Sequence, residues 1–241
     1  MNPSDIIPRW IRELERLSAY KTQLYLYGNT KDTLFYPLGS TQQDWTLGPM
    51  REALFELLRH RLGPYDVIGA YNLVDGMVFA DARDENAMAG IFDEMVGDGE
   101  KFDAQAPKGR APQASKPKEP IEQAIQQIRS CLRNRQHPCA FILEHASQML
   151  TTPVNLQQAE RLGFLRLLMS SSESQLIAVG EGNDRRIVQN MLIFLCDKLT
   201  DLPPWLYFNN PFAGSIMVEA PRGYERRHFF NMFLPPAAQT G

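Results

Sequence analysis

The chain has 241 residues, 44% of them hydrophobic and 22% charged, which is enough for the core of one large or two small globular domains. The formal net charge of −3 argues against a protein that binds polyanions through its overall charge, and no stretch reaches the roughly 20 apolar residues of a membrane span. The first residues lack the basic and apolar regions of a signal peptide, and the 3 cysteines are widely spaced. We therefore expect a cytoplasmic protein with buried, reduced thiols.

The first half of the chain predicts helices and strands in alternation. Apolar residues at helical spacing predict a helix over 7–17, and the β-branched and aromatic run 22–27 predicts a strand that ends at Gly28-Asn29. A second helix is expected over 47–62, where Gly63-Pro64 ends it. Residues 65–80 indicate a strand or a hairpin that turns at 74–76, and a short helix over 85–95 follows.

A break in composition separates the two halves. Residues 97–120 contain 4 prolines and almost no large apolar side chain, so burial cannot offset the entropy of ordering them. We expect a mobile loop there, within a single domain that covers 1–241. The basic residues of this loop allow a contact with nucleic acid, but a solvated linker is the commoner explanation.

The second half indicates an α/β sheet. A helix over 121–132 precedes Cys139–Leu143, a continuous apolar run typical of a strand buried on both faces of a parallel sheet. A helix over 156–169 and a short strand over 175–179 follow, and then strands at Met191–Cys196 and 215–218. Alternating strands and helices predict crossover connections and a parallel sheet with helices on both faces.

Three sequence motifs in this half resemble those of a known family. One strand ends in the acid Glu144, a second runs into Asp197-Lys198-Leu199-Thr200-Asp201-Leu202-Pro203, and a third leads to Pro221 and Glu225-Arg226. Their order resembles the Walker B, sensor 1 and last-strand segments of the AAA+ ATPases. The resemblance implies a three-layer αβα core like that of P-loop NTPases, with a parallel sheet in the order 5-1-4-3-2. Residues 22–27 then lie between the last strand and Met191–Cys196.

The phosphate-binding loop of that family is missing. Such a loop needs G-x-x-x-x-G-K-[ST], because its backbone N–H groups cradle phosphates and its lysine neutralises them. The corresponding place holds Gly28, Lys31 and Thr33, with no second glycine and with Asp32 where it would repel phosphate. We therefore expect a degenerate nucleotide site.

The other catalytic elements are also altered. Glu144-His145 stands where the resemblance implies an acid for Mg²⁺ and an acid for the attacking water, although both residues are equally explained as polar residues at a strand end. The resemblance implies a polar residue at the sensor position, which Asp197 or Thr200 could fill, and Asp197 is equally explained as a helix cap. The arginine finger is replaced by Asn209-Asn210. We expect a vestigial site with no catalytic residue, no metal ligand and no bound cofactor, with ATP and Mg²⁺ left to the parent protein.

An interaction surface is expected instead. The residues proposed for it are aromatic side chains near the last strand and two arginine pairs, because aromatic residues and arginine dominate interface hot spots: Trp205, Tyr207, Phe212, Arg185, Arg186, Arg226 and Arg227. We expect part of 207–212 to be exposed, although core packing and a plain surface loop explain the same residues.

The resemblance implies a non-hydrolysing AAA+ module that acts in oligomer assembly, partner docking or regulation of an AAA+ ATPase whose active domain follows residue 241. A protein partner or self-association is favoured over nucleic acid, and no membrane contact is expected. The alternatives are a clamp-loader-like, DNA-associated subunit and a weakly active ATPase with a non-standard phosphate loop around Lys31 and Glu144.

Overall fold

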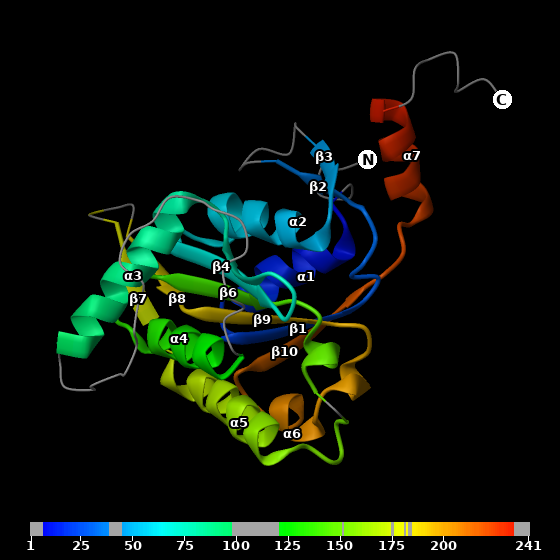
Figure 1. Cartoon of the computed structure of the whole chain (residues 1–241). Helices are drawn as coiled ribbons and strands as arrows, with labels where there is room; N and C mark the ends of the chain where they lie inside the picture. The colour runs from blue at the N-terminus through cyan, green and yellow to red at the C-terminus, as the bar shows by residue number, and fades with distance from the viewer. Residues whose placement is uncertain are drawn as a thin grey trace.

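One six-stranded sheet forms the centre of the molecule, in the order β10-β1-β9-β6-β4-β5 (Figure 1). The computed structural model describes residues 7–38, 45–97, 121–150, 152–174, 176–180, 182 and 185–233. All neighbouring strands of this sheet are parallel except β4 and β5, which form an antiparallel hairpin at one edge. The strands are β1 (Gln23–Gly28), β4 (Val67–Asn72), β5 (Gly76–Phe79), β6 (Cys139–Leu143), β9 (Met191–Cys196) and β10 (Ala213–Val218).

The strands of the sheet interior are buried on both faces. Every residue of β4, β6 and β9 is buried, whereas the edge strand β10 alternates between exposed and buried residues towards its end. Successive side chains of β6 enter opposite layers: Ala140 and Ile142 join one core cluster, and Phe141 joins the other. Continuous apolar runs therefore supply two cores at once.

Helices cover both faces of the sheet (Figure 1). One core cluster contains residues of α1 (Arg9–Ser18) and α2 (Met50–Leu57), and α2 continues as a π-helical turn over Leu58–Leu62. The cluster on the other face contains residues from four helices: α3 (Ala82–Gly97), α4 (Ile121–Arg133), α5 (Gln158–Glu173) and α6 (Pro204–Tyr207). Short 3-10 turns over Ala146–Met149 and Leu199–Asp201 follow β6 and β9.

Two small hairpins and a last helix extend this core. The strands β2 (Leu34–Pro37) and β3 (Trp45–Gly48) pair antiparallel, as do β7 (Leu176–Val179) and β8 (Arg186–Gln189). The helix α7 (Gly223–Phe233) packs on the first hairpin through aromatic rings. Phe35 stacks on Trp45 at 4.5 Å and contacts Phe229 edge-on at 6.0 Å between ring centroids.

The coarse fold prediction is confirmed. The chain is α/β with a mainly parallel sheet flanked by helices, and the segments 22–27, Cys139–Leu143, Met191–Cys196 and 215–218 all contribute strands to it. The hairpin within 65–80 is also present. All three cysteines are buried and free, and burial raises the pKa of the Cys196 thiol to about 12.

One sequence prediction needs correction. The helix expected over 47–62 begins at Met50, because Leu47 pairs with Phe35 in the hairpin and Pro49 precedes the helix. The strand expected over 175–179 is present as β7, which pairs with β8 in a separate hairpin outside the central sheet. The loop expected over 97–120 lies outside the described residues except for Gly97. None of the described helices combines the length and the apolar character that crossing a membrane requires.

Candidate functional site at the carboxyl edge of the sheet

The carboxyl ends of five parallel strands meet at one edge of the sheet, where open α/β sheets bind their ligands. The sequence places Gly28 at the end of β1, Asp197 directly after β9 and Glu144 directly after β6. The parallel registers bring these three positions to the same edge. Three of the predicted residues therefore lie at the same edge of the sheet.

The turn after β1 is tied to the neighbouring strands. Gly28 has a φ of +100°, and a Cβ atom there would lie 2.8 Å from the carbonyl oxygen of Val218. The Gly28 N–H donates to the carbonyl of Asp197 at 3.1 Å, and the Asn29 N–H donates to the carbonyl of Val218 at 2.9 Å. Both hydrogen bonds continue the pairing of β1 with its neighbours β9 and β10 to the end of the strand, so these two N–H groups are not available to a ligand.

Lys31 is paired within the protein. Its Nζ lies 2.8 Å from Oδ2 of Asp197, and the two side chains are 59% and 38% exposed. The backbone N–H of Asp197 donates to Oγ of Ser147 at 3.1 Å, which joins the ends of β9 and β6. Thr33 is exposed beyond this pair. An exposed ion pair of this kind contributes about 1 kcal/mol or less.

Glu144 lies in a second, more buried cluster. Its Oε2 lies 3.0 Å from Nη1 of Arg51 and accepts a hydrogen bond from Nδ2 of Asn72 at 2.8 Å. Nη1 of Arg51 also lies 3.6 Å from Oδ2 of Asp75. The Glu144 side chain is only 12% exposed, so its charge depends on these partners.

Arg51, Asn72 and Asp75 were not anticipated from the sequence. Arg51 lies in the first turn of α2. Its place at a helix start could not be recognised, because the sequence predicts that the helix begins at Leu47. Asn72 has a local signature, since its Oδ1 accepts hydrogen bonds from the N–H groups of Val74 and Asp75 in an Asx turn. The position of Asp75 in a turn was expected, but not its proximity to Arg51.

Glu144 and His145 face different environments. His145 adopts a left-handed conformation with a φ of 53°, and it is exposed whereas Glu144 is buried. The two residues therefore do not form one catalytic pair. Among the described residues, no group of three or more His, Cys, Asp or Glu side chains is arranged to hold a metal ion.

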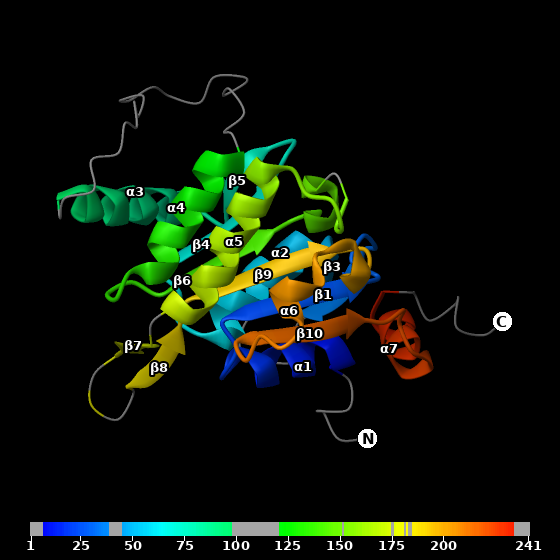
Figure 2. The ribbon, with the colours of Figure 1, turned by 90° about the horizontal axis from the view of Figure 1, so that it is seen from below.

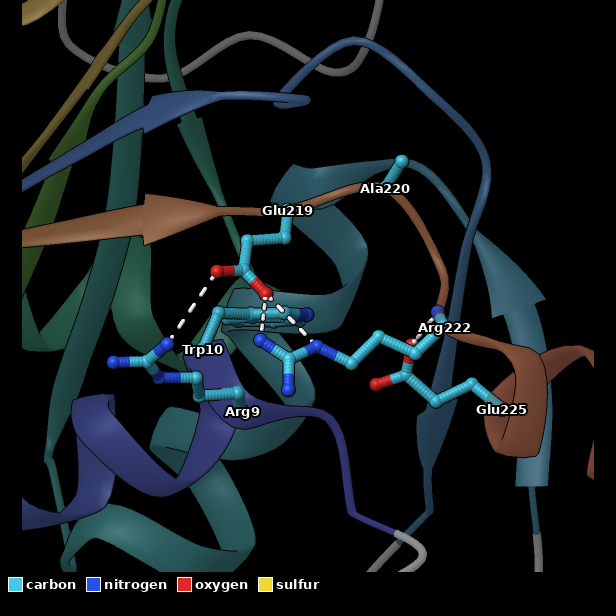
Figure 3. A pocket seen from close by; sticks show the side chains of 6 residues that line it. All are labelled: Arg9, Trp10, Glu219, Ala220, Arg222 and Glu225. Atoms are coloured by element: carbon cyan, nitrogen blue, oxygen red, sulfur yellow. Dashed lines mark hydrogen bonds and ion pairs between the residues drawn. The ribbon is translucent and has the colours of Figure 1, made fainter.

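A polar hollow lies between the end of β10, the start of α7 and α1, and its lining shares no residue with these clusters (Figure 3). Glu219 accepts hydrogen bonds from Nη1 of Arg9 at 3.4 Å and from Nε of Arg222 at 3.0 Å. The N–H of Arg222 donates to Oε2 of Glu225, which closes the first turn of α7. The charges that line this hollow are already paired with one another, so we assign it a structural role in holding α1 and the start of α7 to the end of β10.

The predicted interface residues occupy three separate places. Tyr207 contacts the ring of Tyr25 edge-on at 5.9 Å and Trp205 is half-buried, whereas Phe208 is 68% and Phe212 37% exposed. Part of 207–212 is thus exposed, as expected, and its role as an interface stays a prediction. Arg186 begins β8 with Arg185 before it, and the exposed Arg226 and Arg227 lie on α7 at the opposite end of the molecule (Figure 2).

We expect acid to loosen the contact between α7 and the β2–β3 hairpin. His228 lies 5.2 Å from the Trp45 ring, its Nε2 is buried without a hydrogen-bond partner among the described residues, and burial lowers its pKa from 6.5. The unfolded state then binds more protons, so stability falls as the pH drops below 6.5. The melting temperature should fall less steeply with pH in a His228→Phe variant, and equal slopes would contradict this.

Comparison with known families identifies a match over most of the chain. The family described as AAA+ chaperone, N-terminal Rossmann-like domain, matches residues 2–219. The matched span contains the whole central sheet and both polar clusters at its carboxyl edge, and it ends before α7. A search of curated proteins found no match.

Proposed function

The chain belongs to the family of AAA+ chaperone N-terminal Rossmann-like domains, and we propose that it is a docking or assembly module of an AAA+ protein that does not itself hydrolyse ATP. ATP and Mg²⁺ are assigned in this proposal to another AAA+ domain of the assembly. Its partner in this proposal is a protein rather than nucleic acid, because the two exposed arginine pairs do not lie side by side: one lies at the start of β8 and the other on α7, at opposite ends of the described part of the molecule (Figure 2).

The strand order supports the AAA+ part of the proposal. With the antiparallel edge strand β5 left out, the sheet reads β10-β1-β9-β6-β4. Numbered along the chain, this is the order 5-1-4-3-2 that the resemblance to AAA+ ATPases implies. β1 lies between β10 and β9, as that order requires.

The observation that carries the non-hydrolysing part is the ion pair between Arg51 and Glu144. In an active site of the family, a cation at the start of the helix faces the phosphates and the carboxylate after the third strand faces Mg²⁺ or the attacking water. Here the corresponding cation and carboxylate lie 3.0 Å apart, and Asn72 binds the same carboxylate oxygen. Both charges are satisfied without a nucleotide, and binding one would require breaking the pair.

We predict that millimolar Mg-ATP neither stabilises this chain nor is hydrolysed by it. The turn after β1 lacks the second glycine and the Gly-Lys of a phosphate loop, and two of its N–H groups bind strand ends. Differential scanning fluorimetry tests this directly, because a ligand at about 100 times its Kd adds roughly 2.7 kcal/mol of stability. An intact P-loop ATPase serves as the positive control. A rise of several degrees in the melting temperature, or phosphate release above background, would contradict the proposal.

A further inference from the structure

The solvent face of α5 carries an apolar stripe, which an ordinary surface helix lacks. Leu162, Leu165 and Met169 are 48%, 37% and 51% exposed, while Phe164 and Leu167 of the same helix are buried in the core. Residues at i, i+3 and i+7 share one face of a helix, so the three exposed side chains form a single stripe. No other described element covers α5 on the side that faces the viewer in Figure 2.

The stripe continues into a groove between α5 and the turn that precedes β10. Met169 lines this groove together with Phe208 and Phe212, which are 68% and 37% exposed. The remaining lining residues are Leu168, Ser171, Ser172, Trp205, Asn209, Asn210 and Pro211. Contiguous exposed apolar surface of this kind marks an interaction site.

The turn that holds the two phenylalanines is firmly hydrogen-bonded. Nδ2 of Asn210 donates to the carbonyl of Leu206 at 3.1 Å, and its Oδ1 accepts from the N–H of Phe212 at 3.0 Å. Nζ of Lys21 donates to the carbonyl of Pro211 at 2.6 Å. The exposed rings are therefore presented by an ordered turn, which lowers the entropy lost when a partner binds.

Two arginines flank the stripe without a partner of their own. Arg161 precedes Leu162 and Arg166 follows Leu165, and neither has an ion pair among the residues that the structure describes. Glu173, the acid at the end of the same helix, is neutralised by Arg129 at 2.7 Å, and the hydrogen bonds from Arg129 lower the pKa of its carboxyl. The rim of the apolar surface therefore carries unpaired positive charge.

We propose that α5 and the turn 208–212 form the docking surface for an acidic amphipathic helix of a partner protein. Apolar side chains of that helix would cover the stripe and enter the groove, and its carboxylates would face Arg161 and Arg166. From Leu162 to Met169 the stripe spans about 10 Å at 1.5 Å per residue, which is two turns of a partner helix. This proposal rests on the docking role proposed above and names the surface and the partner chemistry.

The test uses the full chain and two fluorescein-labelled synthetic helical peptides. One has leucines at i, i+3, i+4 and i+7 flanked by glutamates, and the other has lysines in place of the glutamates. In fluorescence anisotropy, we expect the acidic peptide to bind at least about tenfold more tightly, a difference of about 1.4 kcal/mol. The double variant Arg161→Glu with Arg166→Glu should reverse this preference.

Matched variants distinguish specific binding at this surface from nonspecific hydrophobic binding. Phe208→Asp should weaken binding of the acidic peptide at least about tenfold without lowering the melting temperature, because the ring is 68% exposed. Ile187→Asp, at a side chain 72% exposed on β8 and outside the lining of the groove, should leave binding unchanged. Equal binding of the two peptides, no binding of either, or equal losses in these two variants would overturn the proposal.

Self-association must also be measured, by sedimentation velocity. We expect a monomer, and a dimer that Phe208→Asp dissociates would make a second copy of the chain the occupant and overturn the proposal. Stabilisation by Mg-ATP would contradict the proposed non-hydrolysing function while leaving the peptide results intact. Failure of the peptides alone would contradict only this surface.

Discussion

Replacement of Asn190 by alanine should lower the free energy of unfolding by about 3 kcal/mol. Asn190 is fully buried; its Oδ1 accepts from the N–H of Cys139 at 2.8 Å, and its Nδ2 donates to the carbonyls of Leu132 and Asn134 at 2.9 and 3.0 Å. Alanine leaves these backbone groups buried and unpaired, at a cost of roughly 1–3 kcal/mol for each group. One side chain therefore holds the end of α4, the start of β6 and the start of β9 together.

Urea denaturation followed by circular dichroism measures this effect, with Asn86→Ala as the control. Asn86 is an exposed asparagine of α3, and its loss should change stability by about 0.5 kcal/mol or less. Asn190→Asp keeps the acceptor for Cys139 but directs a carboxylate at backbone carbonyls, so it should destabilise the chain at least as much as alanine. A loss below about 1 kcal/mol in Asn190→Ala would show that the backbone groups find other partners.

The effect bears on the candidate site as well as on stability. Glu144 and Asp197 follow β6 and β9, so their relative position depends on the register between those strands. Asn190 binds the first residue of β6 and directly precedes β9, where the register begins. The polar edge of the sheet is therefore positioned in part by a buried amide at the opposite end of its strands.

Much of the central sheet could be predicted because its strands are read from composition alone. The runs Cys139–Leu143 and Met191–Cys196 have only apolar residues and are buried on both faces, which leaves few alternatives. The β2–β3 hairpin has no such signal, since its strands are four residues long and Leu47, Met50 and Leu54 happen to share helical spacing. The helical spacing of these residues continues across Pro49, so the end of β3 resembles the first turn of α2 in the sequence.

The candidate site shows the same division between local and long-range information. Glu144 and Asp197 could be predicted because each directly follows a recognisable strand. The partner of Glu144 could not, because Arg51 is 93 residues away in the chain and the contact exists only once α2 docks beside β6. Exposure somewhere within 207–212 could be expected from the sequence, but not its distribution: Tyr207 packs on Tyr25, whereas Phe208 is exposed. A short helix followed by a turn does not reveal which ring faces the core.

Breaking the ion pair between Arg51 and Glu144 should be the second large effect. The side chains are 29% and 12% exposed, so the cost lies between that of surface pairs and that of fully buried pairs. We expect Arg51→Ala to lower the free energy of unfolding by about 2 kcal/mol, because it leaves the buried carboxylate with Asn72 alone. Glu144→Gln should cost less, since an amide oxygen still accepts the hydrogen bond from Asn72.

A double-mutant cycle measures the pair itself, and the exposed pair between Lys31 and Asp197 is the matched control. We expect a coupling of about 1–2 kcal/mol between Arg51 and Glu144 and no more than about 1 kcal/mol between Lys31 and Asp197. The Arg51–Glu144 pair is proposed to satisfy the charges that a nucleotide and Mg²⁺ would otherwise neutralise. Mg-ATP should nevertheless not restore the stability of Arg51→Ala, because the N–H groups of the β1 turn remain bound to Asp197 and Val218. Additive single effects would show that the pair is incidental. Rescue by Mg-ATP would show that removing Arg51 uncovers a working nucleotide site, which the proposed function does not allow.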